Sequence, residues 1–208
     1  MGAGLALECR LRYPEMYDKY VHLCEEGQIK IGTLWIYKST DRWILNFPTK
    51  NKWRFPSKIE YLQAGLEKFL STYKDKSIAS IAFPLLGADK GGIPQESSLQ
   101  IMTAYLKQAD LEVEIFKYDA NAKDDLYDKI KAWILEQDVE YLTEKTKIGK
   151  AQIKALISAI HDNSEIVQLN QLAAVKGIGI KTLEKVFAIS RTDVGNNRNL
   201  VTEQMNLL

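Results

Sequence analysis

The sequence predicts an α/β domain with a layered sheet, followed by a small all-helical domain. Segments typical of strands and helices alternate up to about residue 137, which is the pattern of an α/β sheet. Beyond that point the apolar residues keep helical spacing throughout. The run at residues 77–86 is apolar at almost every position, as expected for a strand covered on both faces. We therefore expect an α/β domain over residues 1–138 and a helical domain over residues 140–208.

The first elements of the α/β domain follow from turn and capping signals. A short helix is expected over residues 3–12, and Pro14 restarts it as a second helix that ends at Gly27. Residues 33–39 and 43–49 are rich in β-branched and aromatic side chains and are joined by a short polar turn. They are therefore expected to form two strands.

The remaining elements of this domain alternate between helix and strand. Ser57 and Glu60 form a capping-box signature ahead of an apolar stripe with helical spacing. The apolar strand is followed by a helix that begins near Pro94, by a strand over residues 111–118 and by a further helix around Ile130.

The all-helical part contains helical segments and no evident internal repeat. Apolar residues recur at helical spacing between Ile153 and Ile160. Residues 167–190 are predicted to form two short helices around a glycine hairpin.

Composition and charge exclude several classes of protein. The 208 residues carry a formal net charge of +1, so any basic surface must be local. No run reaches the ~20 apolar residues that a membrane helix needs, and no signal-peptide pattern stands at the start. Cys9 and Cys24 lack metal-ligand spacing, so we expect buried, reduced thiols, a cytoplasmic location and no metal site.

The loop after the apolar strand contains three glycines, Gly87, Gly91 and Gly92. Ligands of open α/β sheets lie beyond the carboxyl ends of the strands. Glycines let the backbone approach a ligand closely and turn its N–H groups toward an anion, and the following helix adds the positive end of its dipole. The loop therefore fits a phosphate-bearing ligand, and an ordinary strand-to-helix turn fits these glycines equally well.

Two further stretches favour a ligand site. The chain opens with MGAGLAL (residues 1–7), a second small-residue turn before a helix, and NFPTKNKWR (residues 46–54) ends a predicted strand. With the glycine loop, they resemble the macrodomain family, in the branch of the bacterial DNA ADP-ribosyl glycohydrolase antitoxins and the terminal ADP-ribose protein glycohydrolase of animals. The resemblance covers about residues 1–119. It implies a three-layer α/β/α fold with a mixed sheet that binds ADP-ribose.

The resemblance also implies which residues contact ADP-ribose. The first glycine turn would line the diphosphate and the distal ribose, and the loop after the apolar strand would wrap the diphosphate from the other side. Tyr118 would pack on the adenine. The implied contacts are Gly2, Ala3, Gly4, Thr49, Pro84, Leu86, Gly87, Ala88, Asp89, Lys90, Gly91, Gly92 and Tyr118.

Lys50 matches the lysine that, in this branch, acts on the anomeric carbon of the distal ribose. A desolvated amine has a lowered pKa and can serve as a nucleophile. It would attack C1″ as the glycosidic bond to the modified base breaks, and water would then release ADP-ribose. The alternative for Lys50 is a solvent-facing lysine after a strand.

Two features of the sequence bear on the identity of the substrate. The related animal enzyme carries an acidic residue at the position of Gly91, and the DNA-directed members do without it, which favours DNA. Trp53 and Arg54 would stack on and clamp an unpaired nucleotide. Packing of Trp53 in the core fits the sequence equally well.

The family has two more strands before the first glycine turn, and the second of them lies inside the sheet. The sequence printed here begins at that turn. Three explanations stay open. The natural protein is longer, or another segment such as residues 198–208 or a partner chain fills the gap, or the chain is a degenerate, inactive relative. We favour the first.

Residues 172–187 resemble a helix-hairpin-helix element. Its glycines free backbone N–H groups at a helix N-terminus, where a nucleic-acid phosphate can dock without reading the base. The expected nucleic-acid contacts in this element are Gly177, Gly179, Lys181, Thr182 and Lys185. A packing corner with surface lysines is the alternative.

Three functions from different classes are consistent with these motifs. The first is an antitoxin or DNA-repair enzyme that hydrolyses the bond between ADP-ribose and a DNA base or protein side chain, with no cofactor. The second is ADP-ribose binding without turnover, or neutralisation of a toxin by contact. The third is nucleic-acid binding with a degenerate α/β half. For the enzyme we expect a monomer without membrane partners, opposed to a cognate ADP-ribosyltransferase toxin.

Overall fold

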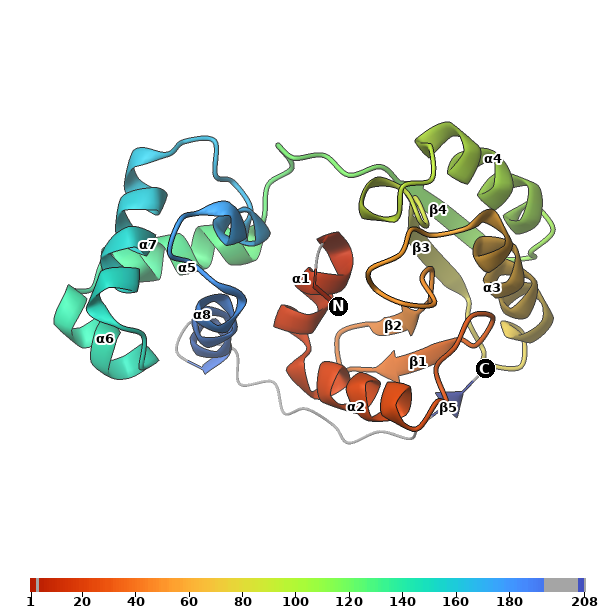
Figure 1. Cartoon of the computed structure of the whole chain (residues 1–208), viewed down its shortest axis with the longest axis horizontal. Coiled ribbons are helices and arrows are strands. Elements are labelled where there is room, and N and C mark those ends of the chain that lie inside the picture. The colour runs from red at the N-terminus through yellow and green to blue at the C-terminus, as the bar shows by residue number, and fades with distance from the viewer. Residues whose placement is uncertain (3, 193–205, 208) are drawn as a thin grey trace. The chain divides into compact units, whose positions relative to one another are not determined.

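The computed structural model describes residues 1–2, 4–192 and 206–207, whose helices and strands are drawn in Figure 1. Contacts divide the chain into two compact units. The α/β unit contains residues 15–118 with the described part of residues 199–208. The helical unit contains residues 1–14 with the described part of residues 119–198.

The α/β unit contains one antiparallel and one parallel pair of strands. β1 (Trp35–Lys38) and β2 (Trp43–Asn46) pair antiparallel. β3 (Ser80–Pro84) and β4 (Glu112–Phe116) pair in parallel. The predicted α/β fold is confirmed. All four predicted strands form, because β-branched and aromatic residues fill them and polar or helical segments separate them.

The segment at residues 198–208, one of the candidates to complete the sheet, contributes the short strand β5 (Asn206–Leu207). It pairs antiparallel with β1. The strand orders are β2-β1-β5 and β3-β4, so in the described structure β5 extends the β1–β2 hairpin and does not join the two sheets.

One apolar core connects both sheets through helix α3 (Ile59–Thr72). Its stripe of Leu62, Leu66 and Phe69 is fully buried, as the helical spacing predicts. The ring of Phe69 meets the ring of Phe83 in β3 edge-on, with 5.5 Å between centroids. Other members of this core come from β1 and the residue before it, and from α4 (Gln95–Leu106), namely Leu34, Ile36, Met102 and Leu106. This packing fixes the end of β3 and the loop that follows it.

β3 is covered on one face only in the described structure. Phe83 is buried, whereas Ser80 and Ala82, which point to the opposite face, are exposed. The prediction of a strand covered on both faces is therefore wrong. Alanine made the run look almost continuously apolar, but its side chain is small enough to be exposed to water at little cost, and serine is polar.

The helical unit contains α1 (Gly4–Arg12), α5 (Asp125–Leu135), α6 (Val139–Thr146), α7 (Lys150–Asp162), the 3-10 segment η2 (Leu169–Ala174) and α8 (Ile180–Thr192). This division differs from the predicted boundary near residue 140. α5 lies in the helical unit because its face of Tyr127, Ile130 and Ile134 is buried in the same core as α7 and α8. α1 lies there because Leu7 and Leu11 join that core.

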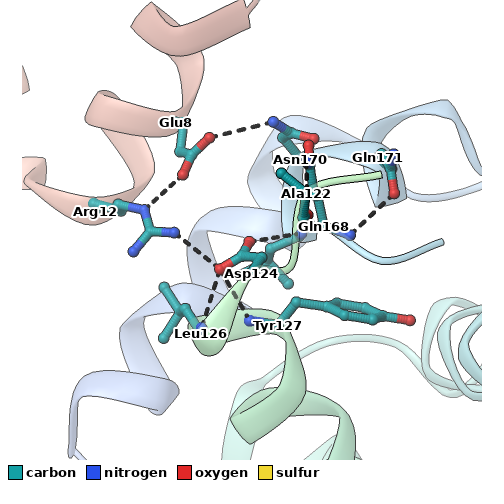
Figure 2. A network of polar contacts seen from close by, with 10 residues as sticks. Glu8, Arg12, Ala122, Asp124, Leu126, Tyr127, Gln168, Asn170 and Gln171 are labelled. Carbon is teal, nitrogen blue, oxygen red and sulfur yellow. Dashed lines mark hydrogen bonds and ion pairs between the residues drawn. The ribbon is translucent and has the colours of Figure 1, made fainter. Parts of the chain in front are cut away.

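A polar network also holds α1 in the helical unit (Figure 2). Asp124 caps the N-terminus of α5 and accepts a hydrogen bond from the backbone N–H of Leu169 at 3.0 Å. Arg12 of α1 lies 3.0 Å from Asp124 and 2.8 Å from Glu8. Burial disfavours the charged form of Arg12, but the charges of Glu8 and Asp124 outweigh it, so the pKa of Arg12 is raised.

The pairs α6–α7 and η2–α8 share one pattern of residues and burial, offset by 30 residues from Leu142 to Leu172, although the first helix is an α-helix in one pair and a 3-10 helix in the other. The residues that precede the two turns, Lys147 and Gly177, both adopt left-handed backbone, with φ of 54° and 89°. The expectation of no internal repeat is therefore wrong. The other equivalent positions are Ile148 and Ile178, Gly149 and Gly179, Ile153 and Leu183, and Leu156 and Val186, whose apolar members are all buried.

α2 (Pro14–Glu25) begins at the predicted proline and belongs, from Glu15 onward, to the α/β unit. Cys9 and Cys24 are thiols. Cys24 is exposed, so the prediction of a buried thiol is wrong for that residue, which lies on the outer side of α2. Within the described ranges, no helix has the length and apolar character that crossing a membrane requires.

Candidate functional site

The glycine loop (residues 87–92) is a tight turn between β3 and α4. Asp89–Gly91 form a single turn of 3-10 helix. The backbone N–H of Ile93 donates to the carbonyl of Gly87 at 3.0 Å and closes the loop. Gly87 and Gly92 have φ of 68° and 83°, a conformation in which other residues are strained. The glycines at both ends are therefore needed for the shape of the turn itself.

The glycine loop is anchored to the core on two sides. The hydroxyl of Ser98 on α4 donates to the carbonyl of Leu86 at 2.7 Å. The backbone N–H of Ser57 donates to the carbonyl of Gly91 at 2.8 Å. Leu86 and Ala88 point into the protein, so only their backbone can face a ligand, whereas Asp89 and Lys90 at the tip are exposed.

Ser57 has a role that its capping-box pattern did not predict. The N-cap of α3 is Lys58, without a side-chain capping bond, so the capping-box prediction is wrong. The Ser57 hydroxyl is buried and finds no hydrogen-bond partner among the described residues. It lies 2.6 Å from the point that a Cβ atom on Gly91 would occupy. Ser57 therefore fills the space that any side chain at position 91 would need.

Replacing Gly91 with alanine is expected to lower the free energy of unfolding of the α/β unit by about 1–3 kcal/mol through overpacking. The new Cβ would stand 2.6 Å from the Oγ and 3.2 Å from the Cβ of Ser57. Adding Ser57→Ala removes the nearer atom and should restore part of the loss. Urea denaturation of the wild type, both single variants and the double variant measures this coupling. Strictly additive losses would show that the two positions do not meet.

Lys50 meets the glycine loop across 40 residues of sequence. It follows β2, is half-buried, and its Nζ donates to the backbone carbonyl of Lys90 at 2.6 Å. Thr49, the residue before it, is half-buried as well. The structure thus brings the predicted catalytic lysine against the predicted diphosphate loop. The alternative of a lysine pointing only to solvent does not fit this contact.

The segment after Lys50 is wholly exposed. Trp53 is 78% exposed, so the alternative that it packs in the core is excluded. The guanidinium carbon of Arg54 lies 5.0 Å from the centroid of the Trp53 ring. Phe55, which the sequence analysis did not single out, is 62% exposed. The sequence could have indicated Phe55 as a second aromatic residue, two positions after Trp53, in a stretch with neither helical nor strand spacing.

The first glycine turn belongs to the helical unit. Gly4 begins α1 with φ of 55°, and Gly2 precedes it. Ala3 lies outside the described residues. Tyr118, at the end of the α/β unit, is 63% exposed. Contacts of Gly2, Ala3, Gly4 and Tyr118 with ADP-ribose stay predictions.

The glycine hairpin of the helical unit presents backbone and lysines to solvent. A Cβ atom on Gly177 or on Gly179 would meet nothing within 4 Å, so the chain itself does not require their small size for packing. Lys181 is exposed, and Thr182 is half-buried. The exposed Lys185 donates to the carbonyl of Lys147 in the equivalent turn of the first repeat. The first of the two predicted short helices is the 3-10 segment η2.

The part of the chain that the structure describes holds no group of three or more histidine, cysteine, aspartate or glutamate side chains that could bind a metal ion. That the reaction needs neither a metal nor a cofactor stays a prediction from the sequence.

Comparison with known proteins identifies the first half of the chain. The family profile of the macro domain matches residues 1–102. The solved macrodomain of Mycobacterium tuberculosis DarG superposes with a TM-score of 0.55 and 35% sequence identity, over 57% of this chain and 82% of that one. The chain belongs to the macrodomain family.

Two further macrodomain relatives extend this finding. A protein of Thermus aquaticus named DNA ADP-ribosyl glycohydrolase is 38% identical over 128 residues, 59% of this chain and 36% of that protein. The solved structure of Thermosipho africanus DarTG in complex with ADP-ribose matches with a TM-score of 0.54 and 27% identity, over 60% of this chain and 36% of that one. The present chain thus spans about a third of the length of the curated relatives it matches.

Proposed function

We propose that this macrodomain is a DNA ADP-ribosyl glycohydrolase that removes ADP-ribose from a modified base. The names of its curated relatives support that activity. One observation links this activity to particular residues. The Nζ atom of Lys50 lies 2.6 Å from the carbonyl oxygen of Lys90 in the glycine loop. A primary amine thus stands beside backbone that is suited to hold a diphosphate.

In the proposed reaction the glycine loop holds the diphosphate, and Tyr118 covers the adenine. Lys50 gives up its extra proton, and its lone pair forms a bond to C1″ of the distal ribose. The bond between C1″ and the base nitrogen breaks, and its electrons leave with the base, which takes up a proton. Water then replaces the amine at C1″ and loses a proton, which releases ADP-ribose and restores Lys50.

DNA is the proposed substrate for two reasons. The acidic residue that the resemblance places in the protein-directed animal enzyme has no counterpart here: position 91 is glycine, and Ser57 occupies the space that an acidic side chain would need. Residues 42–59 contain arginines and lysines but no acidic residue, which favours a polyanion. A relative from Thermosipho africanus is named as a fusion of a DNA ADP-ribosyl transferase with a DNA ADP-ribosyl glycohydrolase. We therefore propose that this chain reverses the product of such a transferase.

Release of free ADP-ribose from an ADP-ribosylated single-stranded oligonucleotide tests the proposal. The chain is expected to release it in repeated turnovers, and to bind free ADP-ribose in calorimetry. Binding heat without any release would instead favour an ADP-ribose-binding module. Release from an ADP-ribosylated protein but not from the oligonucleotide would reject DNA as the substrate.

A second proposed activity is nucleic-acid binding by the glycine hairpin of the helical unit. The observation that favours it is the open space around Gly177 and Gly179, next to exposed Lys181 and Lys185. Backbone N–H groups and lysines in this arrangement suit phosphates and not bases.

Replacing Lys181 and Lys185 together with alanine is expected to weaken binding to single-stranded DNA and to flatten its salt dependence. Each lost phosphate contact removes about 0.7 from the slope of log K against log salt, so the slope should fall by about 1.4. Filter binding or anisotropy at several salt concentrations measures it. The matched control removes Lys123 and Lys129, exposed lysines of the same unit outside the hairpin. Equal slopes for both double variants would count against the hairpin.

A further inference from the structure

The aromatic segment (residues 51–56) presents two rings to solvent. All six of its residues are exposed, and Trp53 and Phe55 are 78% and 62% exposed. Asn51–Phe55 line an open depression in the surface. Neither apolar core of the described residues includes any member of the segment. Two large aromatic side chains that are separated by one residue and exposed to solvent indicate a binding surface.

Both ends of the aromatic segment are fastened to the glycine loop. At one end, Lys50 Nζ donates to the carbonyl of Lys90 at 2.6 Å. At the other end, the backbone N–H of Ser57 donates to the carbonyl of Gly91 at 2.8 Å. Whatever the rings bind therefore lies beside the loop that is proposed to hold the diphosphate.

The charge of the segment selects the kind of partner. Lys52 and Arg54 lie within it, Lys50 and Lys58 flank it, and the nearest acidic residues along the chain are Asp41 and Glu60. The Arg54 guanidinium carbon is 5.0 Å from the Trp53 centroid. Aromatic rings interleaved with cations suit single-stranded nucleic acid, in which base faces stack on the rings and phosphates meet the cations.

We propose that the aromatic segment binds an unpaired base that neighbours the ADP-ribosylated base in single-stranded DNA. Phe55 and Trp53 stack on that base, and Lys52 and Arg54 meet the adjoining phosphates. The inference rests on the proposed function for the position of the modified base. It adds Phe55 as a contact and makes the segment selective for unpaired DNA, because both faces of a base in a duplex are already covered by its neighbours.

Titration of an unmodified single-stranded oligonucleotide into the full chain tests the proposal by tryptophan fluorescence and by anisotropy of the labelled strand. Stacking is expected to quench Trp53. Trp53→Phe should remove that quench, because the indole that reports the stacking is gone. Phe55→Ala should raise the Kd about 5-fold to 100-fold. Trp43→Ala, a control at a tryptophan of β2 that is 45% exposed, should keep the wild-type Kd. An unchanged Kd for Phe55→Ala, or an equal quench by the duplex, would overturn the proposal.

A second measurement separates this inference from the proposed function. Release of ADP-ribose is compared between a modified nucleoside and the same modified base within an oligonucleotide. Phe55→Ala is expected to lower kcat/KM for the oligonucleotide more than for the nucleoside. Equal effects on both would refute the stacking site and leave the hydrolase standing. No release from either substrate, together with a quench that depends on Phe55, would refute the hydrolase and leave the stacking site standing.

Discussion

Lys50→Ala is expected to slow release of ADP-ribose from modified single-stranded DNA by about a thousandfold or more. Without the amine no bond to C1″ can form, and loss of a nucleophile removes a stabilisation that exists only in the transition state. Lys50→Arg should be almost as slow, because a guanidinium keeps its proton and has no lone pair to offer. It can still donate to the carbonyl of Lys90, so calorimetry should find ADP-ribose bound by the arginine variant.

Single-turnover release measures these effects without interference from product dissociation. Lys107→Ala is the matched control, since Lys107 is an exposed lysine of the same unit at the end of α4. It should release ADP-ribose at the wild-type rate. A Lys50→Ala variant as fast as the control would remove Lys50 from the chemistry and leave only a contact between two loops.

Asp124→Ala is expected to lower the free energy of unfolding of the helical unit by about 2–5 kcal/mol. Its carboxylate accepts hydrogen bonds from the N–H groups of Leu126 and Tyr127 at the start of α5, and from the buried N–H of Leu169. Loss of the cap costs about 1 kcal/mol, and a buried N–H left without a partner costs about 1–3 kcal/mol. Arg12 would also lose its partner at 3.0 Å, a smaller term because its side chain is 30% exposed.

Urea denaturation followed by far-UV circular dichroism measures this loss, because most of the helix lies in that unit. Asp138→Ala provides the comparison. Asp138 also caps a helix, α6, through the N–H of Tyr141, but it is exposed and bonds to no second segment in the described structure. Its loss should cost about 1 kcal/mol. If both variants lose the same stability, the network of Figure 2 contributes nothing beyond capping.

Local signals in the sequence were sufficient for the glycine loop. Gly87 and Gly92 adopt positive φ, and a turn between an apolar strand and a helix requires such residues whatever the rest of the fold is. The approach of Lys50 to that loop spans 40 residues. Composition and spacing do not contain that contact, and only the resemblance to macrodomains predicted it.

Ser57 is a residue whose contacts a local sequence pattern predicted wrongly. A serine three residues before a glutamate at the start of an apolar stripe predicts a capping box. Here the backbone of Ser57 bonds to Gly91, which is far away in the sequence, and its hydroxyl turns toward that loop instead of toward α3. A tertiary contact thus replaced the local one.

The placement of α1 and the repeat of the helical unit were missed for related reasons. The apolar face of Leu7 and Leu11 fits either core, and the partner that decides between them, Asp124, lies 112 residues from Arg12. In the repeat, burial at equivalent positions and the left-handed residue before the second helix match, while many of the residue types differ. The shared positive φ at Lys147 and Gly177 is visible only in the structure.

Borohydride trapping of the reaction intermediate tests most directly whether Lys50 forms a bond to C1″. When the amine has replaced the base, opening of the ribose ring gives an imine, and hydride delivered to its carbon leaves a stable secondary amine. Mass spectrometry of the digested protein is predicted to find this adduct on Lys50. Turnover of the substrate with the adduct on another lysine, or on none, would contradict the account.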